Sequence, residues 1–72
     1  MSARPVKHSL TLNGHRTSVS MEDAFWAAFR AAAHQRGLTL NALAAEIDTA
    51  RADDIGLASA IRVYLLQRAQ AK

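Results

Sequence analysis

The chain has 72 residues and a net charge of +3, half of its residues are hydrophobic, and none is cysteine. The absence of cysteine excludes disulfides, thiolate metal sites and a cysteine nucleophile, and the length predicts one small domain with a core only just sufficient for stability. No segment reaches the roughly 20 apolar residues that span a bilayer, and the N-terminus lacks the apolar stretch of a signal peptide. We therefore expect a soluble cytoplasmic protein.

The N-terminal segment is predicted to form β-structure. Residues 1–6 are expected to be a flexible tail, and residues 7–19 a ribbon, because polar and apolar side chains alternate there. Asn13 and Gly14 both tolerate the positive φ angles of a type I′ turn and so indicate a hairpin. The alternative is a single strand from about His15, preceded by a loose arm.

A hairpin about this turn would separate two kinds of side chain. One face would hold the apolar residues Leu10, Leu12 and Val19 together with His8, His15 and Thr17. The other would hold hydroxyl and basic residues, which are Lys7, Ser9, Thr11, Arg16, Ser18 and Ser20. Such a sheet can cover a core with one face. Isolated strands and hairpins are marginal in water, so the sequence favours a homodimer in which the ribbons of two chains meet.

The remaining residues have helical periodicity, and three helices are predicted, over residues 20–36, 39–51 and 57–70. Ser20 is expected to cap the first helix, with Asp23 reaching back in a variant capping box. Gly37 suits the position just beyond the end of that helix. Thr39 is expected to cap the second helix.

The excess positive charge lies before the first predicted helix. Arg4, Lys7 and Arg16 are the only charged residues before Met21, and the rest of the chain has equal numbers of basic and acidic residues. A dimer would combine two such segments into one basic surface, which is typical of nucleic-acid binding. The alternative is that these charges only aid solubility.

Several residues form a longer pattern: Val19 and Met21, Phe25 and Phe29, Ala32 and Ala33, residues 37–41, and the segments 14–22, 46–48 and 59–63. This pattern resembles the ribbon-helix-helix superfamily of dimeric bacterial DNA-binding proteins, and in particular a subfamily of small alphaproteobacterial ribbon-helix-helix domain proteins. The resemblance implies a mostly α-helical homodimer with a short N-terminal β-ribbon or hairpin and an additional C-terminal helix.

The resemblance also implies that the ribbon enters the major groove of double-stranded DNA. Arg16 and Ser18 would then contact bases. Phosphates would be contacted by Lys7 and by the start of the second helix, at Thr39, Leu40 and Asn41. The dimer core would consist of Val19, Met21, Phe25, Trp26, Phe29, Leu43 and Ile47.

These observations predict a transcriptional regulator or an antitoxin-like repressor with no cofactor and no metal. The sequence contains no phosphate-binding loop, nucleophile elbow or pair of histidines at helical spacing, so we expect no enzymatic activity. The alternative is a dimeric protein-interaction module without DNA readout. A hairpin in each chain favours that alternative, because a dimer sheet of four strands would be too broad for a groove about 12 Å wide. The third helix would strengthen the dimer or bind another protein.

Overall fold

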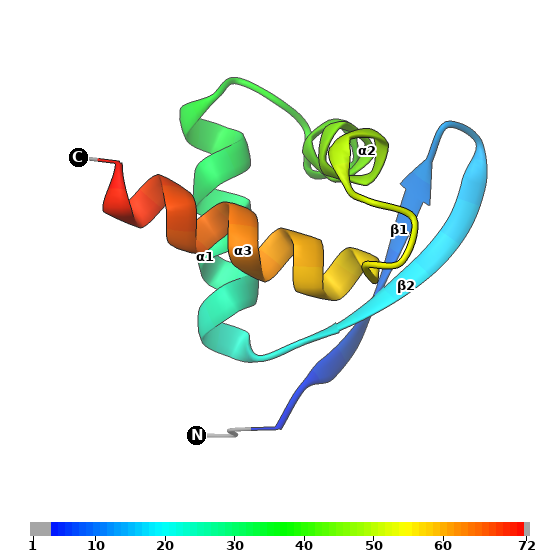
Figure 1. The fold of residues 1–72 in the computed structure, drawn as a ribbon, viewed down its shortest axis with the longest axis horizontal. Coiled ribbons are helices and arrows are strands. Elements are labelled where there is room, and N and C mark those ends of the chain that lie inside the picture. The colour runs from blue at the N-terminus through cyan, green and yellow to red at the C-terminus, as the bar shows by residue number, and fades with distance from the viewer. Residues whose placement is uncertain (1–3, 72) are drawn as a thin grey trace.

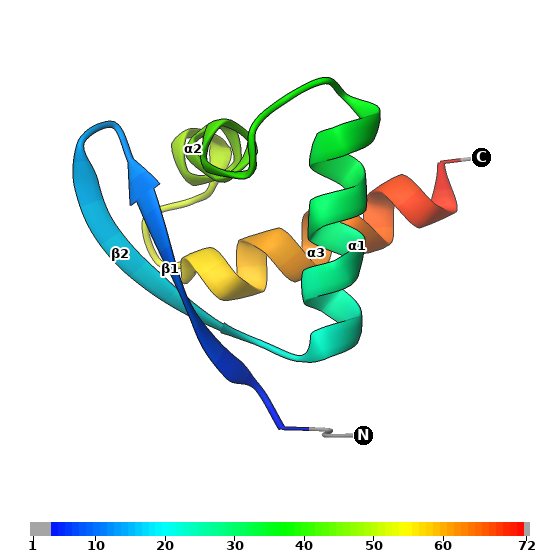
Figure 2. The ribbon, with the colours of Figure 1, turned by 180° about the vertical axis from the view of Figure 1, so that it is seen from behind.

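The computed structural model, which describes residues 4–71, contains a two-stranded antiparallel hairpin packed against three helices (Figures 1 and 2). The strands are β1 (Val6–Leu12) and β2 (His15–Met21), and the helices are α1 (Asp23–Gln35), α2 (Leu40–Ala50) and α3 (Leu57–Gln70). The predicted fold, an N-terminal ribbon or hairpin followed by helices that include an additional C-terminal one, is confirmed. Of the two alternatives for the N-terminal segment, the chain forms the hairpin.

The hairpin turn has the expected backbone conformation. Asn13 and Gly14 have φ angles of 52° and 85°, and Leu12 pairs with His15 across the turn. The predicted sorting of side chains follows from this register. At the end near the turn α2 packs on β1, which leaves His15 and Thr17 of β2 exposed although they lie on the inner face. The tail was predicted to extend through residue 6, but β1 already begins at Val6. Residues 1–3 of the predicted tail lie outside the described residues.

The prediction that Ser20 caps the first helix with Asp23 is wrong. Strand β2 continues through Met21, Glu22 occupies the position before α1, and no side chain caps the helix there. The Ser20 carbonyl oxygen instead accepts a hydrogen bond of 3.0 Å from Nη2 of Arg62 in α3, and the Glu22 carboxylate pairs with the same guanidinium. These bonds from α3 hold the last residues of β2 and the start of α1.

The turn between α1 and α2 follows the sequence prediction. Gly37 has a φ angle of 66°, and the Leu38 amide donates to the Ala33 carbonyl at 2.9 Å, as at many helix ends that contain a left-handed glycine. Thr39 Oγ1 accepts a hydrogen bond of 3.0 Å from the Ala42 amide and caps α2. Helix α2 itself therefore begins at Leu40 and ends at Ala50.

The core forms where the apolar face of the hairpin meets the three helices. Its largest fully buried side chains are Met21, Phe29, Leu43 and Ile61, which come from β2, α1, α2 and α3 respectively. Each such side chain contributes roughly 2 kcal/mol by its removal from water. The single chain thus encloses a hydrophobic core of its own.

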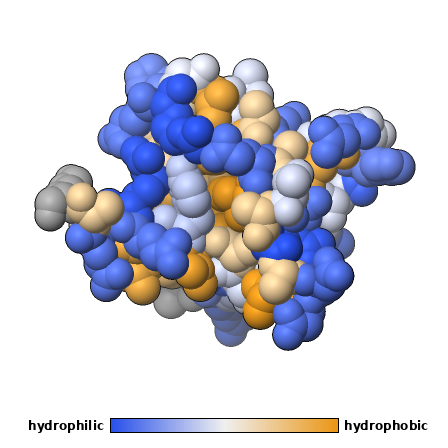
Figure 3. Space-filling model, turned by 45° about the horizontal axis from the view of Figure 1, so that its top comes forward, coloured by the Kyte–Doolittle hydropathy of each residue, from blue (hydrophilic) through white to orange (hydrophobic). Residues whose placement is uncertain are grey.

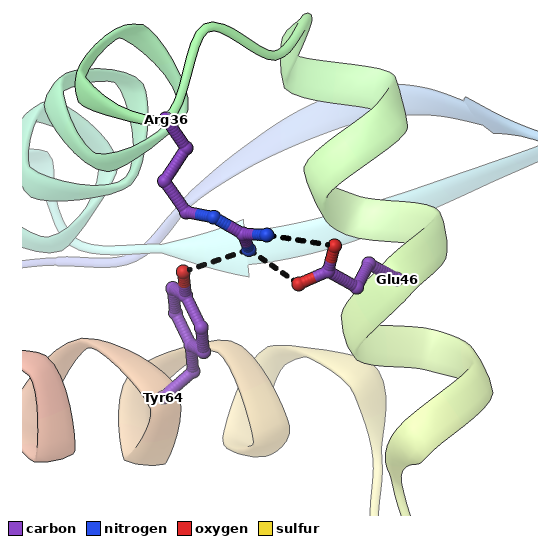
Figure 4. A network of polar contacts seen from close by, with 3 residues as sticks. All are labelled: Arg36, Glu46 and Tyr64. Carbon is purple, nitrogen blue, oxygen red and sulfur yellow. Dashed lines mark hydrogen bonds and ion pairs between the residues drawn. The ribbon is translucent and has the colours of Figure 1, made fainter.

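Arg36, at the end of α1, joins the three helices (Figure 4). Its guanidinium pairs with both oxygens of Glu46 in α2, with Nη2 3.1 Å from Oε1, and Nη1 donates to Tyr64 Oη in α3 at 3.3 Å. The hydrogen bonds from Arg36 lower the pKa of Glu46, and those to Glu46 and Tyr64 raise the pKa of Arg36. All of these groups lie at the surface, so the network aligns the helices more than it adds to their stability.

Candidate nucleic-acid interface

The outward face of the hairpin carries only hydroxyl and basic side chains. All of them are exposed, and they are Lys7, Ser9, Thr11, Arg16, Ser18 and Ser20. The register places Arg16 opposite Thr11 and Lys7 opposite Ser20, so the two cations lie on one face. Ser20, which faces Lys7, lies four residues from Arg16 along β2, or about 13 Å of strand. We call this set of six residues the hairpin face.

The charges of the hairpin face are not neutralised within the described chain, where neither Lys7 nor Arg16 forms an ion pair. The ion pairs of the structure belong to the helices and the residues beside them, and they are Arg36–Glu46, Arg51–Asp48 and Arg62–Glu22. The excess positive charge noted in the sequence therefore remains available at the hairpin face for an anionic partner.

Helix α2 begins beside the turn of the hairpin. The Thr11 amide donates to Asn41 Oδ1 at 3.1 Å, which ties β1 to the first turn of α2. The Asn41 side chain and the Thr39 hydroxyl are thus engaged in structural bonds, and Leu40 is half-buried. What this end of the helix offers an anion is its backbone, since the amides of Leu40 and Asn41 have no partner among the described residues and point along the helix dipole.

The same hydrogen bond shows how the backbone of β2 is oriented. The Thr11 amide bonds to α2 and so points away from β2, which means that the Thr11–Arg16 pair is not hydrogen-bonded. Hydrogen-bonded and non-hydrogen-bonded pairs alternate along an antiparallel ladder, so the Ser9–Ser18 pair is not hydrogen-bonded either. The amides and carbonyls of Arg16 and Ser18 therefore point away from β1. No further strand joins β2 in the sheet that the described residues form, so this edge is open between Arg16 and Ser18.

The predicted dimer-core residues divide into two groups in the structure. Five are buried within the single chain, and they are Val19, Met21, Phe29, Leu43 and Ile47. These side chains have almost no accessible surface left to bury against another copy. Phe25 remains 36% exposed, and Trp26 is half-buried with its ring stacked on His8, the ring centroids 3.8 Å apart.

Two contacts of the site were not evident from the sequence, those between Thr11 and Asn41 and between His8 and Trp26, because both join the hairpin to distant helical residues. The exposed apolar residues Val63 and Leu66 were also missed, although their three-residue spacing on the side of a helix away from Ile61 was a usable signal.

Metal and membrane sites receive no support from the described residues. No group of three histidine, aspartate or glutamate side chains among them lies close enough to hold a metal ion. None of the helices in the described chain has the length and apolar character needed to cross a membrane.

Comparison with known proteins bears on the whole fold. A family model described as a ribbon-helix-helix domain matches residues 5–69, which include both strands and nearly all of α3. No curated protein and no solved structure gives a significant match.

Proposed function

Because the chain belongs to the ribbon-helix-helix family, whose members are generally dimeric, DNA-binding and non-enzymatic regulators, we propose that it is a homodimeric, sequence-selective DNA-binding protein. It acts as a transcriptional regulator or an antitoxin-like repressor. The observation that carries the proposal is the hairpin face, an exposed surface of hydroxyl groups with two cations that no carboxylate of the described chain neutralises.

The hairpin of one chain has suitable dimensions for DNA. Two strands about 5 Å apart fit a major groove about 12 Å wide, whereas a sheet of four strands does not. In this proposal each chain inserts its own hairpin, so no strand from a second chain is needed beside it in the groove. Arg16 makes a bidentate contact to guanine, and Ser18, in the middle of the face, contacts a neighbouring base edge.

Phosphate contacts lie at both ends of the hairpin face. Lys7 lies at the end away from the turn, and the free amides at the start of α2 lie beside Thr11 near the turn. About 13 Å of strand separates Lys7 from Thr11. With the strands running along the groove, the two contacts suit phosphates about that far apart along it, with the base-reading residues between them.

The test is fluorescence anisotropy with a labelled fragment from upstream of the protein's own gene and with a scrambled duplex, each in a salt series. We expect tighter binding to the upstream fragment and affinity that falls as salt rises, because phosphate contacts release counterions. Arg16→Gln should reduce the preference by about tenfold or more, the value of one bidentate base contact.

The matched control is Arg68→Gln, which removes the same charge from α3, where Arg68 contacts Gln35 and Tyr64. This variant should keep the preference for the upstream fragment. Equal binding of wild type to both duplexes, or the same loss in both variants, would contradict base readout by the hairpin face.

A second candidate function is a dimeric protein-interaction module on the same scaffold. It is favoured by the short supply of long polar side chains on the hairpin face, where Arg16 and Lys7 are accompanied only by serine and threonine. A folded dimer that binds neither duplex at low salt, and that retains a specific protein in a pull-down, would support this candidate over DNA binding.

A further inference from the structure

Near the turn of the hairpin, helical cover lies mainly under one of the two strands. Helix α2 packs on β1, where Leu10 and Leu12 are buried, whereas His15 and Thr17 on the inner face of β2 are exposed. Figure 3 shows the turn end of the hairpin as a mostly hydrophilic projection at the right of the molecule. Arg16 lies between the two exposed residues, so β1 sets its place relative to the helices.

A side-chain hydrogen bond joins this part of β1 to α2. The Thr11 amide donates to Asn41 Oδ1 at 3.1 Å, across 30 residues of sequence. The register places Thr11 directly opposite Arg16, and the Cα atoms of a pair that is not hydrogen-bonded lie about 4.5 Å apart. The position of Arg16 relative to α2 therefore depends on a path of three residues, from Arg16 through Thr11 to Asn41.

The other attachment of the hairpin is too distant to replace this bond. Arg62 of α3 donates to the Ser20 carbonyl oxygen at 3.0 Å, at the end of β2 away from the turn. Four residues of strand, about 13 Å, lie between Ser20 and Arg16. A two-stranded ribbon twists readily over such a length, so Asn41 restrains Arg16 more closely than Arg62 does.

The side chain and the backbone of Asn41 have separate roles. A backbone amide can only donate, so the carboxamide atom that faces Thr11 is the oxygen, and Nδ2 lies on the other side of the group. The backbone amide of Asn41, like that of Leu40, has no partner among the described residues. One residue thus holds the hairpin with its side chain and leaves its main-chain donor available for a phosphate.

We propose that Asn41 is a positioning residue for the hairpin face, whose side chain holds Arg16 at a fixed place relative to the free amides of α2. A phosphate bound at those amides then brings Arg16 to its base without further ordering of the hairpin. Loss of the bond leaves every DNA-contacting group present but lets the turn end of the hairpin move independently of α2. This inference rests on the proposed function and assigns the Asn41 side chain a part in its selectivity.

The experiment uses the full chain with the upstream and scrambled duplexes. Asn41→Ala removes the acceptor and keeps both free amides, so binding to the scrambled duplex should change by less than about twofold. The preference for the upstream fragment should fall at least about fivefold, the lower end of the value of one bidentate base contact. Hydrogen exchange followed by NMR should show that the Thr11 amide has lost its protection.

Asn41→Asp separates position from phosphate contact. Its carboxylate can still accept from the Thr11 amide, so the protection of that amide and the preference for the upstream fragment should both be retained. The added negative charge repels phosphates beside α2, so affinity for both duplexes should fall together, and most at low salt. A residue that only supports the fold would not divide preference from overall affinity in this way.

The matched control is Thr49→Ala, which removes a side-chain hydrogen bond to the Ala45 carbonyl oxygen at the other end of α2. It should keep both the preference and the protection of the Thr11 amide. If circular dichroism shows that Asn41→Ala is unfolded, Thr11→Pro replaces it. Proline removes the donor of the same bond, which points away from β2, and should cause the same loss of preference.

The inference and the proposed function fail in different ways. Equal binding of wild type to both duplexes would refute the proposed function and this inference with it. If wild type prefers the upstream fragment and Asn41→Ala keeps that preference after Thr11 has lost its protection, the inference alone is overturned. An equal loss of preference in Asn41→Asp, with the Thr11 amide still protected, would also overturn it, because Nδ2 would then act on the DNA directly.

Discussion

Glu46 shows how much of a residue's role depends on partners that lie far away in the sequence. It is 10 residues from Arg36, and Arg36 is 28 residues from Tyr64. No short motif connects these three residues, so composition and spacing do not identify the network. Thr39, by contrast, caps the helix that directly follows it, which is why its role is predictable from the sequence.

Replacing Glu46 by glutamine should change the acid stability of the protein. Arg36 lowers the pKa of Glu46 in the folded chain, whereas an unfolded glutamate has a pKa of about 4.3. The ion pair therefore stabilises the folded chain above about pH 4.3, and this contribution is lost as the pH falls through the lowered folded-state pKa. Melting temperatures of wild type and Glu46→Gln should differ at neutral pH and converge once the pH has fallen below the lowered folded-state pKa of Glu46.

The control for this experiment is Asp53→Asn, at an exposed position in the turn before α3. The melting temperature of Asp53→Asn should fall between neutral and acid pH by about the same amount as that of wild type. A constant gap between wild type and Glu46→Gln across the pH range would show that the charge of Glu46 has no part in stability.

Among the elements, the hairpin was predictable and the start of the first helix was not. Asn13 and Gly14 determine the turn by their own backbone preferences. Ser20 and Asp23 have the spacing of a helix cap, but Arg62, 42 residues from Ser20, bonds to the Ser20 carbonyl oxygen within β2. Tertiary contact thus overrides a local signal, and it does so at the boundary between two elements.

Two glycine substitutions should separate backbone strain from the effect of an added methyl group. Gly14→Ala should lower the free energy of unfolding by about 1–2 kcal/mol, because Gly14 has a φ angle of 85°. Gly56→Ala should change it by less than about 1 kcal/mol, because Gly56 has a φ angle of −65°. An added methyl group meets no atom within 4 Å at either position.

Urea unfolding followed by far-ultraviolet circular dichroism measures both changes. Equal effects of the two substitutions would show that the left-handed turn carries no special cost and would argue against the turn conformation of the hairpin.

At the scale of the whole molecule, the sequence pattern predicted which residues are apolar and inward-facing, and only the family resemblance assigned them to a core between two chains. The pattern of Met21, Phe29 and Leu43 is the same whether a core lies within one chain or between two. In the structure α3 completes the core within the chain through Ile61, which is fully buried. The candidate DNA contacts at Arg16 and Ser18 keep their predicted exposure, because the hairpin needs only its other face for that core.

The dependence of the core on α3 can be measured with one substitution. Ile61→Ala should lower the free energy of unfolding by about 2–5 kcal/mol, because it leaves a cavity at the centre of the molecule. That is a large share of the roughly 4–11 kcal/mol expected for a domain of this length. Val6→Ala, at a side chain that is 42% exposed, should cost less than about 1 kcal/mol in the same urea titration. A small effect of Ile61→Ala would mean that α3 is not integral to the fold.

The stacking of His8 on Trp26 gives the molecule a built-in optical probe. Trp26 is the only tryptophan of the chain, and the ring that covers it, with an angle of 4° between the two planes, comes from β1. Separation of the hairpin from α1 would expose the indole to water while the helices remain in place. Intrinsic fluorescence and helical circular dichroism therefore report on different parts of one small protein, and a time lag between them would reveal the hairpin opening as a distinct event.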